Sequence, residues 1–224
     1  MVAGRLKFLQ EAAIENVKQI LDIGSWHLKQ SIEFASIFDN AKINAFEPVP
    51  ESFDLCIANL NAVDDKKKKR IKVHNIALSN EVGEIPFFPV DANQSSVPNI
   101  GASSMFRFVE GKNGTMFGQN LNQKEIKVRA TTLDKWCEEN KIKHIDIIWM
   151  DAQGSELLVL QGAKKMLNNT RIIMTEVGLQ PYYQGHTLKA DIDKLLFSYG
   201  FKELHSSFEI NVPDYEANTI YVKR

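Results

Sequence analysis

The chain has 224 residues, of which 44% are hydrophobic and 25% are charged, and its formal net charge is −1. This length suffices for one sizeable domain with a full core. The near-neutral charge excludes no enzyme class, but it gives no reason to expect nucleic acid or an anionic membrane as the partner.

Targeting and redox signals are also absent from the sequence. No apolar run approaches the ~20 residues of a membrane span, and the N-terminal residues lack the apolar core of a signal peptide. The two cysteines, Cys56 and Cys137, lie far apart and form no C-x-x-C motif, which is consistent with a reducing compartment and no structural metal. The sequence therefore predicts a cytoplasmic protein.

Strands and helices alternate along the first third of the chain. Apolar spacing predicts helices over residues 5–17 and 27–38 and a third helix after Pro48 and Pro50, with strands at 19–23, 43–46 and 71–76, the last continuing through residue 79. The basic run 66–70 falls between a helix and a strand, and we interpret it as a solvated loop.

The alternation weakens between residues 86 and 125. Beyond a strand at 85–90, the segment is rich in Asn, Gln, Ser and Gly and carries scattered aromatic residues. A segment of this length inside a compact domain is typical of a lid or an acceptor-binding loop, and a flexible surface insertion is the alternative.

The second half is regular again. Strands are predicted at 125–130, 145–150 and 171–175, helices at 155–167 and 188–199 and after Thr132, and an antiparallel strand pair at 201–205 and 217–222. Gly200 suits the left-handed end of the helix before it. The pattern predicts one α/β domain over residues 1–224, built on a doubly wound, mostly parallel sheet.

Four carboxylates lie at the ends of the predicted strands: Asp22, Glu47, Asp151 and Glu176. The carboxyl ends of parallel strands form the edge where open α/β sheets bind ligands. Gly24 alone follows the first strand, whereas dinucleotide binding uses three glycines, and Asp22 would repel a pyrophosphate. A phosphate-free cofactor with a cationic end, S-adenosyl-L-methionine, fits better, with Asp22 facing its ammonium group and Glu47 its ribose.

Five segments in this order resemble the motifs of the FkbM-type methyltransferases. They are residues 21–24, 46–50, 75–80, 132–134 and 150–163. The resemblance implies the class I methyltransferase fold, a Rossmann-like seven-stranded sheet with an antiparallel last strand. It also implies in-line methyl transfer from S-adenosyl-L-methionine to a hydroxyl of a sugar, glycan or natural product.

The expected site has three groups of residues. The cofactor-binding group is Asp22, Gly24, Ser25, Trp26, Glu47, Pro48 and Ala77. The candidates for a catalytic base are Asp151, Glu176 and His186. The acceptor-binding group is Ser103, Ser104, Gln153, Glu156, Tyr182 and Tyr183, whose two tyrosines lie in a glycine-bounded loop that suits a carbohydrate face.

Several alternatives remain. The carboxylates could be helix caps or first-turn residues, and His186 could be a plain surface group. Trp26 and Gln153 depart from the family pattern, which favours a degenerate methyltransferase-fold binding module. A nicotinamide-binding oxidoreductase is disfavoured by the missing glycines, and an amino-group methyltransferase of nucleic acid by the absence of an Asn/Asp-Pro-Pro-Tyr run after the fourth strand. The sequence predicts a small molecule or a glycan as the acceptor but does not identify it. A homodimer is one possible oligomeric state.

Overall fold

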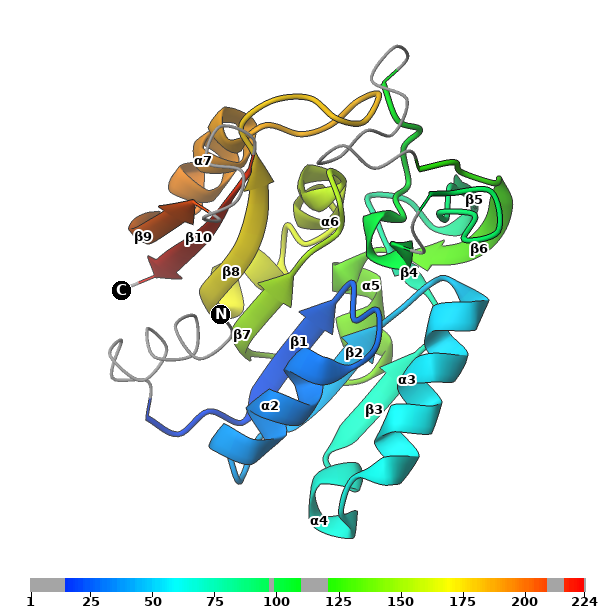
Figure 1. Cartoon of the computed structure of the whole chain (residues 1–224). Coiled ribbons are helices and arrows are strands. Elements are labelled where there is room, and N and C mark those ends of the chain that lie inside the picture. Colours follow the sequence, from blue (N-terminus) through cyan, green and yellow to red (C-terminus); the bar gives the residue numbers. More distant parts are fainter. Residues whose placement is uncertain (1–14, 97–98, 110–120, 209–215, 224) are drawn as a thin grey trace.

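The protein is built on a seven-stranded sheet (Figure 1). The computed structural model describes residues 15–96, 99–109, 121–208 and 216–223. The strands are β1 (Gln19–Ile23), β2 (Lys42–Phe46), β3 (Ile71–His74), β7 (Ile145–Met150), β8 (Thr170–Gly178), β9 (Phe201–Phe208) and β10 (Glu216–Lys223). Their order is β3-β2-β1-β7-β8-β10-β9. The first five are parallel, and β10 is antiparallel to both β8 and β9, which confirms the predicted fold class.

Helices cover both faces of this sheet. Leu21 and Ile23 of β1 pack in one buried cluster with residues of α5 (Leu133–Glu139), α6 (Glu156–Gln161) and α7 (Lys189–Ser198). Ile20, on the opposite face of β1, packs with α2 (Lys29–Ile37) and α3 (Pro50–Ala62). This period-two alternation of apolar side chains makes both faces of the strand core, so the sheet is doubly wound.

A second, three-stranded sheet replaces the predicted continuation of the third strand. Its strands are β4 (Ala77–Leu78), β5 (Gly83–Phe87) and β6 (Ile126–Thr131), in the order β4-β6-β5. The prediction of one strand over residues 71–79 was therefore wrong. The chain leaves the large sheet at Asn75, whose side-chain amide donates to the carbonyls of Glu47 (2.9 Å) and Pro48 (3.1 Å).

The described part of the polar segment 86–125 is packed against the domain. Phe88, Val90, Ala102 and Leu121 are buried, and the short 3₁₀ helix η1 (Ile100–Ala102) belongs to this layer. In Figure 1 the segment and the small sheet lie beyond the carboxyl ends of β1 and β2. This packing argues against a flexible surface insertion for the described residues, and the role as lid or acceptor-binding loop stays a prediction; residues 110–120 lie outside the described part.

Three other boundaries differ from prediction. The helix expected over 155–167 is interrupted, because α6 ends at Gln161 and a 3₁₀ helix, η2, occupies Met166–Asn169. Strand β8 continues through Glu176 to Gly178. Most of the helix expected over 5–17 lies outside the described residues, and residues 15–17 are not helical.

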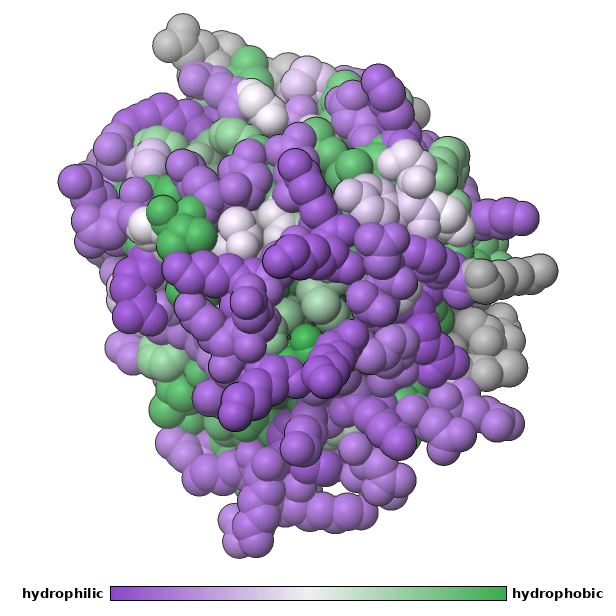
Figure 2. Space-filling view, turned by 180° about the vertical axis from the view of Figure 1, so that it is seen from behind, coloured by the Kyte–Doolittle hydropathy of each residue, from purple (hydrophilic) through white to green (hydrophobic). Residues whose placement is uncertain are grey.

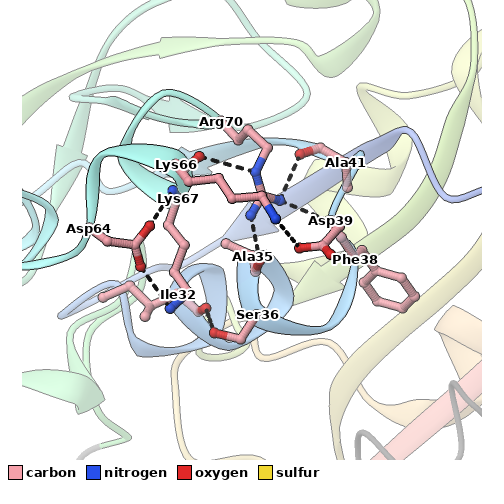
Figure 3. A network of polar contacts seen from close by, with 10 residues as sticks. All are labelled: Ile32, Ala35, Ser36, Phe38, Asp39, Ala41, Asp64, Lys66, Lys67 and Arg70. Atoms are coloured by element: carbon pink, nitrogen blue, oxygen red, sulfur yellow. Dashed lines mark hydrogen bonds and ion pairs between the residues drawn. The ribbon is translucent and has the colours of Figure 1, made fainter.

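The basic run is a helix and a cap, which corrects its interpretation as a loop (Figure 3). Residues Asp65–Lys68 form α4, and Asp64 caps it by accepting the backbone N–H of Lys67 at 3.0 Å. The guanidinium of Arg70 donates to the carbonyls of Ala35 (2.6 Å) and Phe38 (2.8 Å). These carbonyls lie in the last turn and at the C-cap of α2, where intrahelical donors run out. Arg70 therefore caps this helix together with the backbone N–H of Ala41, which donates to Phe38 at 3.1 Å.

The outer surface is largely polar. Hydrophilic residues cover most of the face seen in Figure 2, and apolar residues show between them in small patches. Within the described residues, no helix combines the length and apolar character needed to cross a membrane.

Candidate active site

A cleft opens at the carboxyl ends of β1, β2 and β7. Its empty space is about 550 Å³, a figure that includes the open solvent at its mouth. The lining residues are Ile23, Gly24, Trp26, Phe46, Glu47, Pro48, Ser52, Ile76, Ala77, Leu78, Phe87, Ile100, Gly101, Ser103, Met105, Asp151, Ala152 and Gln153. Most of this wall is apolar, and its two carboxylates, Glu47 and Asp151, follow β2 and β7, the strands on either side of β1.

The turn after β1 brings two strand ends into close contact at Gly24. Its φ is +82°, and a Cβ at this position would lie 1.9 Å from the carbonyl oxygen of Asp151. The backbone N–H groups of Gly24 and Ser25 both donate to the carbonyl of Phe46 at 3.1 Å. Only glycine combines this backbone conformation with this approach, so the single glycine of the motif is required by the geometry.

Glu47 presents its carboxylate in the cleft wall. Its Oε2 accepts the backbone N–H of Trp26 at 2.8 Å, and its Oε1 accepts that of Val49 at 2.9 Å. Burial raises the pKa of Glu47 to about 7. Each carboxylate oxygen has a second lone pair, so Glu47 can still accept hydrogen bonds from a ligand in the cleft.

Asp22 lies behind the cleft and does not line it. The side chain is fully buried, and Oδ2 accepts the hydroxyl of Ser31 at 2.6 Å. Oδ1 has no hydrogen-bond partner within the described part, and burial raises the pKa of Asp22 to about 6. Ser25 also lies beneath the turn, since its hydroxyl donates to the carbonyl of Asp22 at 2.9 Å. Asp22 and Ser25 therefore lie beneath the turn, and neither lines the cleft.

Trp26 stands at the rim of the cleft. It has a φ of +46°, and its indole is stacked on His27 with ring centroids 4.1 Å apart. The residue is 40% exposed. A Cβ on Gly101 would lie 3.5 Å from the indole, so the ring meets the polar segment here. In Figure 1 the turn between β1 and α2 lies on the side of the large sheet where the small sheet is found.

Gln153 connects Asp151, which follows β7, with Glu176, which lies within β8. Its side-chain amide nitrogen donates to Oδ1 of Asp151 at 2.7 Å and to Oε1 of Glu176 at 3.0 Å. Its oxygen accepts the hydroxyl of Tyr183 at 2.8 Å. A neutral amide with two N–H donors therefore separates two carboxylates that would otherwise repel each other.

His186 is placed away from the cleft, in the wall of a second cavity. Its Nδ1 lies 3.1 Å from the backbone nitrogen of Tyr182 and accepts that N–H, so Nε2 carries the proton of the neutral ring. Burial lowers the pKa of His186 to about 4. Since the remaining nitrogen is already protonated, the ring offers no free lone pair to a reacting hydroxyl.

The two serines expected to bind the acceptor differ in position. Ser103 lines the cleft, and its hydroxyl donates to the carbonyl of Ile100 at 2.6 Å. Ser104 is fully buried, and its hydroxyl donates to the carbonyl of Gln153 at 2.7 Å. Ser104 therefore ties the polar segment to the loop after β7.

The tyrosine pair is packed inside the protein. Tyr182 and Tyr183 are 8% and 2% exposed, in a buried cluster with residues of the polar segment. The ring of Tyr183 is stacked on Phe108 with centroids 5.3 Å apart. Both tyrosines also line the second cavity, and their role in acceptor binding stays a prediction.

The second cavity shares Gln153 with the cleft and has room for about one water molecule. It is lined by Gln153, Gly154, Glu156, Glu176, Gly178, Tyr182, Tyr183, His186 and Glu216. Among them, only Glu216 and the glycines were missed by sequence reasoning. Glu216 reaches the cavity because β10 pairs it with Gly178, a contact that no local pattern could reveal.

Comparison with known proteins decides the family. Residues 24–203 match the family described as the methyltransferase FkbM domain. The chain belongs to this family. It is also 33% identical over 178 residues to the 2-O-methyltransferase NoeI of Sinorhizobium fredii strain NGR234, covering 79% of this chain and 70% of that protein. This FkbM protein is therefore a methyltransferase, which excludes the alternative of a nicotinamide-binding oxidoreductase.

Solved structures share the fold of this FkbM methyltransferase. Magnesium protoporphyrin IX methyltransferase from Synechocystis PCC 6803 with bound SAM has a TM-score of 0.58 at 10% identity, covering 100% of this chain and 78% of that one. A SAM-dependent methyltransferase from Aquifex aeolicus has a TM-score of 0.50 at 11% identity, covering 97% and 88%. At these identities the likeness concerns the fold alone.

Proposed function

We propose that this FkbM methyltransferase transfers a methyl group from S-adenosyl-L-methionine to a hydroxyl of a sugar, glycan or natural-product acceptor. The observation that carries the proposal is the mostly apolar cleft with Glu47 on one wall and Asp151 on the other. The description of its relative NoeI as a 2-O-methyltransferase supports an oxygen acceptor.

The residues of the cleft suit this cofactor. Glu47 would accept the ribose hydroxyls, and the apolar surfaces of Pro48 and Ala77 would contact the adenosyl group. Asp22 would contribute negative potential from behind the turn, because its Oδ1 is not neutralised by a described partner. When bound, the cofactor supplies an electrophilic methyl group on a positively charged sulfur.

The protein would contribute alignment and a proton acceptor. Alignment of a nucleophile with an electrophile supplies about 7–11 kcal/mol in favourable cases, and a positioned base about 10²–10⁴-fold in rate. Asp151 lines the cleft, and Glu176 is joined to it through Gln153. We assign the base to this carboxylate pair, since His186 has no lone pair available.

Calorimetry with S-adenosylhomocysteine tests the cofactor assignment. We expect micromolar affinity for the wild type and no binding of NADH. Glu47→Ala removes two acceptors for the ribose hydroxyls, each worth about 1.5–3 kcal/mol for a charged group, so the affinity should fall by about 10²-fold or more.

Glu138→Gln, an exposed acid on α5, is the control and should bind like the wild type. Circular dichroism of Glu47→Ala checks that the variant is folded, and we expect the spectrum of the wild type. Unchanged affinity in that variant would remove the ribose assignment, and cofactor binding without turnover on any hydroxylated acceptor would favour the binding-module alternative.

A further inference from the structure

Ser52 is a polar residue of the cleft wall whose hydroxyl is not used by the protein. The residue lies in the first turn of α3, is 4% exposed and lines the cleft. Its hydroxyl makes no hydrogen bond to any residue that the structure describes. By contrast, the hydroxyl of Ser103 donates to the carbonyl of Ile100 and accepts the N–H of Val90 at 3.0 Å. A buried hydroxyl that lines a cleft without a partner is available to a ligand.

The first turn of α3 also lacks a side-chain cap. Val49 is the N-cap and accepts no hydrogen bond through its side chain, and Pro50 occupies the first helical position. The N-terminal end of a helix carries a partial positive charge, which favours an electron-rich ligand atom. The carboxylate of Glu47 lines the same cleft and disfavours an anion. A neutral hydrogen-bond acceptor satisfies both conditions.

The cleft changes from polar to apolar along the carboxyl edge of the sheet. Asp151 lies beyond β7, Glu47 beyond β2, and Ala77 and Leu78 beyond β3, and all four line the cleft. Because the strand order is β3-β2-β1-β7, Asp151 and the two apolar residues lie toward opposite ends, with Glu47 between them. Ser52 belongs to the helix that connects β2 with β3, so its hydroxyl lies toward the apolar end.

Apolar side chains surround Ser52 at this end of the cleft. Val49 packs with Ala77 and Phe87 in a buried cluster, and Met105 packs against the same cluster. Figure 1 shows the N-terminal end of α3 beside the small sheet, whose strand β5 supplies Phe87. Phe87 and Met105 also line the cleft. An apolar wall with one hydroxyl suits a flat aromatic ring that has nitrogen acceptors at its edge.

We propose that Ser52 binds the base of the cofactor and that its hydroxyl donates a hydrogen bond to a ring nitrogen of the adenine. The proposal rests on the proposed function, in which Glu47 accepts the ribose hydroxyls, and it adds the residue that selects the base. The cationic end of the cofactor would then lie toward β1 and β7, where Asp22 and Asp151 are found. A base without this nitrogen would bind more weakly, because it would leave the buried hydroxyl unpaired.

The test uses S-adenosylhomocysteine and its 1-deaza, 3-deaza and 7-deaza counterparts, in each of which C–H replaces one ring nitrogen of the adenine. Calorimetry on the full-length protein gives a dissociation constant for each ligand. We expect at least one analogue to bind about three- to tenfold more weakly than S-adenosylhomocysteine, the factor that corresponds to one net hydrogen bond.

Ser52→Ala shows whether this residue causes the discrimination. The variant should bind S-adenosylhomocysteine about three- to tenfold more weakly than the wild type does. It should bind the discriminated analogue as well as the wild type does, because the hydrogen bond is already missing from that complex.

Ser36→Ala is the matched control. Ser36 is an exposed serine of α2, outside the cleft, and its hydroxyl donates to the carbonyl of Ile32 at 3.0 Å. This variant should keep the affinities of the wild type for all the ligands. Alanine has a higher helix propensity than serine, so both variants should fold, and thermal unfolding checks that they do.

Unchanged affinity of Ser52→Ala for S-adenosylhomocysteine would overturn the proposal. A loss of affinity that is the same for S-adenosylhomocysteine and for all three analogues would also overturn it, because the hydroxyl would then act on the shape of the cleft and not on the base. In both cases the proposed function survives, since the wild type still binds S-adenosylhomocysteine. Absence of that binding in the wild type would remove the proposed function and this assignment together.

Discussion

The shape of the cleft depends on the absence of a side chain at Gly24. Gly24 and Gly200 share a φ of +82°, but an added Cβ would meet the carbonyl of Asp151 at 1.9 Å in the first case and nothing closer than 3.9 Å in the second. Gly200→Ala should lower the free energy of unfolding by about 1–2 kcal/mol, the cost of the left-handed conformation alone. Gly24→Ala should cost more, because the strand ends must also move apart.

Urea denaturation of both variants, with calorimetry for S-adenosylhomocysteine, measures the difference. Gly24→Ala should also lose cofactor affinity, whereas Gly200→Ala should keep it. Equal destabilisation of the two variants would show that the approach to Asp151 relaxes without cost.

The sequence predicted the positions of some site residues correctly and of others not. The rule that ligands bind at the carboxyl ends of parallel strands correctly brought Glu47 and Asp151 to one cleft. The same rule does not say which way a strand-end side chain turns, and Asp22 turns toward Ser31 of α2 instead of the cleft. Tyr183 is buried by contacts with the polar segment, which no local pattern encodes.

Among the elements, α2 depends on a side chain from outside the helix. Arg70 donates to two of its last carbonyls, at 2.6 and 2.8 Å. A lysine has a single compact ammonium and does not reproduce the planar fork. Arg70→Lys should therefore lower the free energy of unfolding by about 1.5–3 kcal/mol, the range for hydrogen bonds to a charged group.

Thermal or urea denaturation measures this loss, with Arg129→Lys on an exposed position of β6 as the matched control, expected within about 0.5 kcal/mol of the wild type. If both variants unfold alike, the hydrogen bonds of Arg70 drawn in Figure 3 contribute no more to stability than those of a lysine would.

The sequence predicted most helices and strands and their type. It predicted the residues at which they end less well. Apolar periodicity reveals a strand but not its partner, so β3 and β4 were merged although they join different sheets. The residue after α6 also makes a tertiary contact: a Cβ at Gly162 would lie 2.1 Å from the carbonyl oxygen of Ser79. Such close approaches depend on the assembled fold.

For the molecule as a whole, three buried carboxyl groups link stability to pH. Burial raises the pKa of Asp22 from 3.8 to about 6, and those of Glu47 and Glu156 from 4.5 to about 7. Between these values the folded state binds more protons than the unfolded chain, so the free energy of unfolding should fall as the pH rises from about 4 to about 7. The loss of stability caused by ionising these buried groups is absent below this pH window and complete above it.

Urea denaturation at constant ionic strength across the window measures the slope, which Glu156→Gln should make shallower. A free energy of unfolding that stays constant or increases over the same interval would mean that these groups ionise in the folded protein as they do in water.

The position of β10 between β8 and β9 has a consequence for how the chain is made. The strand that completes the sheet is synthesised after both of its neighbours, so β8 keeps an unpaired edge, and β9 has no place in the sheet, until residues 216–223 leave the ribosome. During that interval the wall to which Glu216 belongs does not exist, and the nascent protein exposes backbone donors and acceptors that other chains can pair with.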